Sequence, residues 1–234
     1  MTSGRGFSTH EPSSSITNGL LGPYLNQPAQ LTRLSSLISQ STLSPDRLLM
    51  TIGANELHWS EAAQDCLIVG AVLPVPGSQE ACVLAWMPRI NGFVSSLPAT
   101  FMVLHDVMSH LPVNPSNVYL TDYFDPLDSQ FLQQPICGPE PEAGFVFRQF
   151  AADSVFKPLQ KIVMDAATGG WQFVGGIGNA FQFHGVCQPT PLRWVNNTTD
   201  SLLGQGDLNG FMHANAIGQG VVADYVYNAI IPGL

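Results

Sequence analysis

The sequence predicts a mainly β protein, in which antiparallel sheets form a barrel or sandwich with one or two short helices near the N-terminus. In residues 161–186, large apolar residues alternate with polar ones, as in strands that bury one face. Glycine-containing stretches interrupt this alternation at 165–170 and 175–179, and glycine supplies the positive-φ positions of tight hairpin turns. The chain also contains 22 Gly, 18 Pro and only 11% charged residues, which is typical of a loop-rich β protein.

The strongest strand signal lies in residues 161–186. Segments 162–165, 171–174 and 180–184 are short and are joined by the two glycine-containing turns, so we expect an antiparallel meander. The run Gly175-Gly176-Ile177-Gly178 superficially matches a dinucleotide-binding loop. Such a loop must lie between a strand and a helix. Because the following residues alternate as a strand does, we interpret the run as a hairpin turn.

The rest of the chain divides into an arm and one domain. Residues 1–28 are rich in Ser, Gly, Thr and Pro and have no apolar period, so we expect a flexible N-terminal arm or hinge. Residues 29–234 are expected to form a single β-rich domain. Its first segments are helical, because apolar residues at 31, 34, 37 and 38 suit a short amphipathic helix and Ser44-Pro45 suits a helix start.

Further strands are expected along the domain. The apolar runs 66–73, 81–87, 101–104, 117–121 and 143–150 are each of strand length. Residues 88–142 are proline-rich and are expected to form a loop-rich outer insertion. The apolar segment 221–231 fits either a closing strand or a helix, and the sequence does not distinguish the two.

Charge and cysteine usage exclude several classes of function. The net charge is −9, which disfavours binding to nucleic acid or to an anionic membrane surface. The sequence contains no apolar run of membrane-spanning length. Residues 1–18 lack the apolar region of a signal peptide. The four cysteines, at 66, 82, 137 and 187, form no CxxC pair, so they do not indicate a metal site. Disulfides are possible, but because no signal peptide is visible we expect buried free thiols.

Two local clusters contain residue types that are found in catalytic or metal sites. His105, Asp106 and His110 form H-D-V-M-S-H, but metal-binding helices of the zincin type place two histidines four residues apart with Glu after the first. A spacing of five turns the imidazoles about 140° apart on a helix, so we expect a polar rim. Asp122, Asp125 and Asp128 lack the glycine of an EF-hand calcium loop. No catalytic residue, metal ligand or cofactor is therefore predicted.

Two further features have structural interpretations. Asn196-Asn197-Thr198-Thr199 contains overlapping glycosylation sequons, which we interpret as a polar surface turn. The four tryptophans, at 59, 86, 171 and 194, are interpreted as core or interface anchors rather than carbohydrate platforms.

Several of these segments resemble the protruding domain of calicivirus and related picorna-like capsid proteins. The similar parts are the strand and turn at 162–169, the strand at 171–174, Gly178-Asn179 and the aromatic strand at 181–184. The aromatic segment 144–148 and the entry segments 31–49 and 65–70 are also similar to that family. Residues 88–141 are shorter than the family's outer insertion, which holds its receptor sites, so no binding residue is transferred.

The resemblance implies a structural and host-attachment function rather than an enzyme. It implies a homodimer on the surface of a non-enveloped virion assembled in the host cytoplasm, in contact with other capsid subunits. Loops within 88–142 would bind a host glycan or protein receptor. Two alternatives remain open: a hydrolase with a site around His105, Asp106 and His110, and a non-viral carbohydrate-binding β-sandwich, for which Trp59 or Trp194 would be exposed beside an uncharged groove.

Overall fold

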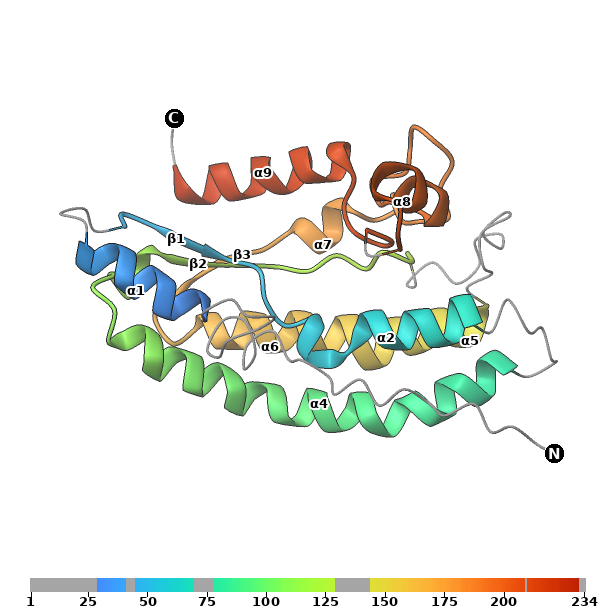
Figure 1. The fold of residues 1–234 in the computed structure, drawn as a ribbon, viewed down its shortest axis with the longest axis horizontal. Helices are drawn as coiled ribbons and strands as arrows, with labels where there is room; N and C mark the ends of the chain where they lie inside the picture. Colours follow the sequence, from blue (N-terminus) through green and yellow to red (C-terminus); the bar gives the residue numbers. More distant parts are fainter. Residues whose placement is uncertain (1–28, 41–44, 70–77, 129–143, 209, 232–234) are drawn as a thin grey trace.

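The computed structural model describes residues 29–40, 45–69, 78–128, 144–208 and 210–231. The predicted arm, residues 1–28, lies outside the described residues, as does much of the second half of the predicted insertion. The predicted antiparallel β-barrel or sandwich is wrong. The described chain is mostly helical, and its three short strands form one open parallel sheet (Figure 1).

The strands are β1 (Leu48–Met50), β2 (Val118–Thr121) and β3 (Gln172–Val174), in the order β1-β2-β3. Both pairs are parallel, with Leu49 opposite Tyr119 and Leu120 opposite Phe173. Parallel neighbours require a long crossover, which is usually helical. The helical segments between the strands make these two connections.

Helices occupy both sides of this sheet. The α-helices are α1 (Gln30–Gln40), α2 (Trp59–Ala63), α4 (Ser78–Ser109), α5 (Phe145–Phe150), α6 (Lys157–Ala167), α7 (Ile177–Ala180), α8 (Thr198–Gln205) and α9 (Ala216–Ile230). The π-helical segments η3 (Gln64–Val69) and η5 (Ala151–Phe156) continue α2 and join α5 to α6. Short 3₁₀ turns lie at η2 (Asn55–Leu57) and η4 (Pro115–Asn117). In Figure 1, α1, α2, α4, α5 and α6 lie on one side of the sheet and α7, α8 and α9 on the other.

The stretch that predicted a meander contains one helix, one strand and one helical turn. Residues 162–165 belong to α6, whose buried Leu159, Val163 and Ala167 recur every four residues, as the core face of a helix requires. Only 172–174 is a strand, and it pairs in parallel with β2. Gly176, at φ +90°, precedes α7 rather than closing a hairpin. Residues 181–184 continue from α7 as a turn.

Most of the other predicted strands are also helical. Segments 81–87 and 101–104 lie in α4, which continues through Pro88 and Pro98, so residues 88–109 are not a loop. The buried residues of α4 recur at helical spacing: Val83, Trp86, Ile90, Leu97, Phe101, Leu104 and Met108. Segment 143–150 contains α5 instead of a strand, and residues 66–69 belong to η3. The predicted helix at 31–38 and the strand at 117–121 are present as α1 and β2. The helix predicted to start at Ser44-Pro45 is wrong, because Leu48–Met50 forms β1.

The core lies between the sheet and the helices that cover it. Leu120 of β2, Leu104 of α4 and Leu159 of α6 are fully buried in one cluster. Trp59 of α2 packs between Phe147 and Phe156, at ring-centroid distances of 5.5 and 4.9 Å. Burying aromatic rings of this size contributes strongly to stability, so α2 is fixed to the α5–α6 layer.

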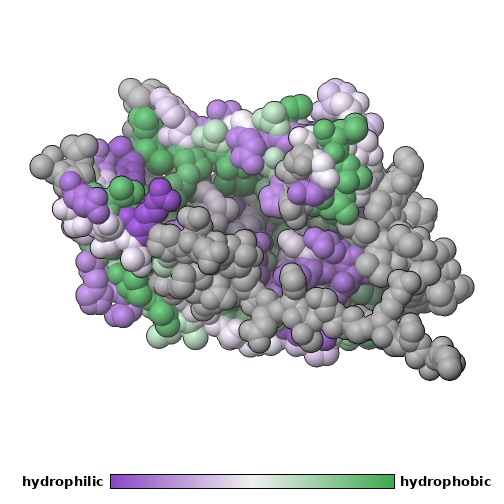
Figure 2. Space-filling model, viewed as in Figure 1, coloured by the Kyte–Doolittle hydropathy of each residue, from purple (hydrophilic) through white to green (hydrophobic). Residues whose placement is uncertain are grey.

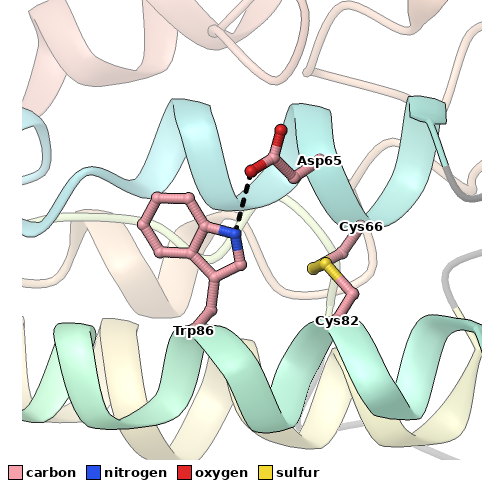
Figure 3. Close-up of a disulfide and its surroundings, with 4 residues drawn as sticks. All are labelled: Asp65, Cys66, Cys82 and Trp86. Carbon is pink, nitrogen blue, oxygen red and sulfur yellow. Dashed lines mark hydrogen bonds between the residues drawn. A yellow bond between two sulfur atoms is a disulfide. The ribbon is translucent and has the colours of Figure 1, made fainter. Parts of the chain in front are cut away.

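A disulfide ties η3 to α4. The bond joins Cys66 to Cys82, whose Cα atoms are 5.5 Å apart (Figure 3). Beside it, Trp86 Nε1 donates a hydrogen bond of 3.1 Å to Asp65 (Figure 3). Cys187 is also disulfide-bonded. The predicted free thiols are therefore wrong for these three cysteines, and Cys137 lies outside the described residues.

Helix α9 resolves the ambiguity that the sequence left at 221–231, since it continues to Ile230. Asn215 begins the helix, with its side-chain oxygen accepting hydrogen bonds from the N–H groups of Ile217 and Gly218. Hydrophobic residues gather over α9 in Figure 2, and Tyr227 is exposed. Within the described ranges, no helix combines the length and apolar character needed to cross a membrane.

Candidate binding site at the carboxyl edge of the sheet

A cavity of about 440 Å³ lies where β1 and β2 end. Its floor includes Thr51, which follows β1, and residues 121–124 at the end of β2. In open α/β sheets, ligands bind outside the carboxyl ends of the strands. A volume of this size falls within the range of small-molecule sites. The cavity therefore has the position and the size of a ligand site.

Segments far apart in the sequence form the walls. One wall comes from α2 and its flanks, and the other from the segment that leads into α9. Helices α2 and α9 lie on opposite sides of the sheet (Figure 1). The lining residues from these walls are Ala54, Asn55, Trp59, Ser60, Ala63 and Gln64, and Leu208, Phe211, Met212, His213, Ala214, Gln219 and Val222. Pro126, Phe156 and Ile177 complete the lining. Most of these side chains are apolar or aromatic.

Hydrogen bonds fix the polar groups of the floor. The hydroxyls of Thr51 and Thr121 are 2.7 Å apart, and the Thr121 hydroxyl also donates to the Met50 carbonyl at 3.4 Å. The Tyr123 hydroxyl accepts a hydrogen bond of 3.4 Å from the Ala54 N–H. Burial raises the pKa of the Tyr123 phenol well above its usual range, so the phenol stays neutral. The floor is thus preformed and has fixed polar groups.

Asp122 is the carboxylate on this floor. One oxygen accepts the N–H of Tyr123 at 2.8 Å, and the other accepts the N–H of Gly178 at 3.1 Å. Gly178 lies in the first turn of α7, so the carboxylate binds one helix N–H group that lacks a partner within the helix. Burial raises the pKa of the Asp122 carboxyl against the opposing effect of these hydrogen bonds. The side chain is held in one place and its charge is partly desolvated.

A short antiparallel bridge places His213 at the rim. Val195 pairs with Ala214, the Asn196 N–H donates to the His213 carbonyl at 2.8 Å, and the Met212 N–H donates to the Asn196 carbonyl at 3.0 Å. His213 is exposed, and its Nδ1 lies 3.3 Å from the Phe211 carbonyl. This imidazole can contact a ligand at the opening of the cavity.

The structure places the sequence-predicted histidines elsewhere. His105 lies on α4, with Nε2 2.7 Å from the Ala166 carbonyl and its ring stacked on Trp171 at 3.6 Å. His110 is exposed, and its Nδ1 lies 2.8 Å from the carbonyl of Asp106. None of the residues His105, Asp106 and His110 lines the cavity. Across the described parts of the chain, no three His, Cys, Asp or Glu residues are grouped to hold a metal.

The candidate calcium ligands Asp122, Asp125 and Asp128 accept hydrogen bonds from backbone N–H groups. Asp125 accepts from Leu127 at 2.9 Å. Asp128 accepts from Phe183 at 3.0 Å and from Gly185 at 2.8 Å. Together with Asp122, these carboxylates organise the turns next to the sheet.

The sequons and tryptophans have structural roles. Asn197 is buried and begins α8, where its side chain and that of Asp200 form reciprocal hydrogen bonds with the backbone. Trp59, Trp86 and Trp171 are buried. Trp194 stacks on His184 with ring centroids 3.5 Å apart. The carbohydrate-binding alternative needs Trp59 or Trp194 exposed, but Trp59 is buried and Trp194 is half-buried.

Sequence reasoning missed most of the site. Its one usable signal is Thr121-Asp122-Tyr123, which directly follows a predicted strand. In a parallel sheet, polar residues at the carboxyl end of a strand indicate a ligand site. In the predicted antiparallel sheet, the end of this strand does not indicate one. Ser60 and His213 carry no local motif.

Comparison with known proteins finds no relative of this chain. No protein-family model, curated protein or solved structure matches this chain. Nothing in these comparisons identifies a calicivirus protruding domain. The parallel α/β fold also removes the antiparallel meander from which that resemblance was drawn.

Proposed function

We propose that this chain is a small-molecule-binding protein whose site is the cavity at the carboxyl ends of β1 and β2. The observation that carries the proposal is the position of this 440 Å³ cavity. It opens where the topology of a parallel sheet collects polar side chains from different strands. A second pocket, which Asp125, Phe156 and Gln160 help to line, is much smaller, at about 50 Å³.

The lining supports binding of a compact molecule with a large apolar part. Trp59, Phe124, Phe156 and Phe211 offer aromatic surface, and removal of apolar ligand surface from water contributes about 25 cal/mol per Å². Thr51, Asn55 and Gln64 add a few polar groups that can orient the ligand. A mostly apolar lining with a few fixed polar groups is the usual composition of small-molecule sites.

Neither earlier hypothesis explains this geometry. Host attachment was predicted for loops on a β scaffold, and no such scaffold is present among the described residues. The hydrolase alternative needs His105 and His110 to act on one substrate. His105 is instead engaged by the Ala166 carbonyl and by stacking on Trp171. Binding in the cavity uses residues that the fold has already brought together.

A fluorescent probe tests the proposal. N-phenyl-1-naphthylamine, which is neutral and fluoresces more strongly away from water, should bind the wild-type chain saturably. Ser60→Trp places a bulky side chain at an exposed position on the cavity wall and should abolish the fluorescence increase. Ser96→Trp is the matched control, because Ser96 is exposed on α4 and does not line the cavity. Equal titrations of all three proteins would contradict the proposal.

A further inference from the structure

The described lining of the cavity contains a carboxylate but no Lys or Arg to balance its charge. This carboxylate belongs to Asp122. The described basic side chains lie elsewhere, at Arg33, Arg47, Arg89, Arg148, Lys157, Lys161 and Arg193. Of these, Lys157, Lys161 and Arg193 form ion pairs with aspartates outside the cavity. The whole chain carries a net charge of −9, so an anionic ligand would be repelled both locally and at a distance.

From this imbalance we propose that the natural ligand carries a positively charged amine on an apolar body, and that the Asp122 carboxylate binds the amine. The inference rests on the proposed function and names the ligand class of the same site. With a neutral ligand, the partly desolvated carboxylate would keep its two backbone hydrogen bonds but would have no opposite charge beside it. A cationic ligand supplies the opposite charge, and hydrogen bonds between ionised groups are stronger than neutral ones.

Asp122 is suited to this role because the backbone already orients it. The N–H groups of Tyr123 and Gly178, at 2.8 and 3.1 Å, take different oxygens of the carboxylate. An ionised carboxylate has about four acceptor positions, so acceptor capacity remains for an ammonium group. Since the side chain need not be ordered on binding, little entropy is lost.

Aromatic rings add a second attraction for the same ligand class. Trp59, Tyr123, Phe124, Phe156 and Phe211 all line the cavity. The faces of such rings attract cations, and their area accommodates an apolar body. A cavity whose lining contains both a carboxylate and aromatic rings thus favours an amine over an alcohol or an acid of the same shape.

Three compounds with one skeleton test the inference on the wild-type chain. Titration calorimetry at about pH 7 would compare 4-phenylbutylamine, 4-phenylbutan-1-ol and 4-phenylbutyrate. We expect the amine to bind about tenfold to one hundredfold more tightly than the alcohol, as a charged hydrogen bond would give, and the acid to bind least.

Asp122→Asn provides the matched variant. It keeps an acceptor oxygen for one of the two backbone N–H groups but removes the charge, and should reduce the affinity for the amine to that for the alcohol. Asp165→Asn removes the same charge from an exposed side chain of α6 and should leave the preference unchanged.

The outcomes separate the two proposals. If 4-phenylbutylamine binds wild-type protein no more tightly than the alcohol, or does not bind, the ligand class is wrong. Saturable binding of N-phenyl-1-naphthylamine in the same preparation would then still support the cavity as a binding site, and its absence would overturn both. The comparison on wild-type protein decides the matter even if Asp122→Asn fails to fold.

Discussion

Replacing Asp128 with alanine should destabilise the fold by about 1–4 kcal/mol. The Asp128 side chain is 3% exposed, and its carboxylate accepts the backbone N–H groups of Phe183 and Gly185 at 3.0 and 2.8 Å. Alanine would leave both N–H groups without this acceptor. The hydrogen bond from Gly185 is buried, and a buried donor left unpaired costs about 1–3 kcal/mol. The hydrogen bond from Phe183 is only partly buried, so its loss adds about 1 kcal/mol at most. Asp128 also has φ +52°, a conformation that Asp tolerates better than Ala.

Urea denaturation followed by far-UV circular dichroism would measure this loss as a change in the free energy of unfolding. Asp165→Ala is the control, because Asp165 is exposed and loses only its surface ion pair with Lys161. Such pairs contribute about 0–1 kcal/mol. If Asp128→Ala were no less stable than Asp165→Ala, the carboxylate would not hold the turn at 183–185, and our explanation of the aspartate cluster would be wrong.

Two further predictions concern the disulfide and the dependence on pH. Changing Cys66 and Cys82 together to alanine should lower the free energy of unfolding by about 3 kcal/mol, because the disulfide closes a loop between residues 16 apart. Urea unfolding would measure this loss, and an unchanged midpoint would contradict the prediction. Burial raises the pKa of the Asp128 carboxyl, so the folded state favours its protonated form. The stability of wild type relative to Asp128→Asn should therefore be greatest below the ordinary pKa of 3.8 and decline as pH rises through the folded-state pKa. Unfolding measured in both proteins from about pH 3 to pH 7 checks the sign, and a constant difference would show that Asp128 does not titrate in this way.

The sequence predicted helix α1 correctly because its apolar residues have a clear helical period. It failed where apolar runs were short, since runs such as 81–87 and 143–150 have strand length and β-compatible residues. Their helical form is determined by packing against distant segments. Pro88 also suggested a break, because proline removes a helical hydrogen bond, yet α4 continues through it.

The glycines at 175 and 176 show why the topology was wrong. A strand, a glycine turn and a further segment describe a hairpin and a strand-to-helix connection equally well. Here Gly176 precedes α7, and the Asp122 carboxylate binds the N–H of Gly178 in that helix. That partner lies 56 residues away, so no local pattern could reveal it.

The candidate site was only partly visible in the sequence for the same reason. Asp122 follows a strand that was predicted. Only the parallel pairing of that strand with β1 and β3 shows that Asp122 lies at an edge where ligands bind. Ser60 and His213 enter the cavity from α2 and from the segment before α9. Their convergence depends on the two helical layers, which a predicted β-sandwich does not contain.

The most direct test of the central claim is a map of where a small amine binds. Backbone amide shifts of ¹⁵N-labelled wild-type protein would be recorded during titration with 4-phenylbutylamine. We expect saturable changes at Thr51, Ser60, residues 121–124 and His213, which belong to separate segments and meet only at the cavity. Changes confined to α4 around His105, or spread weakly over the surface, would contradict a ligand site at the carboxyl edge of the sheet.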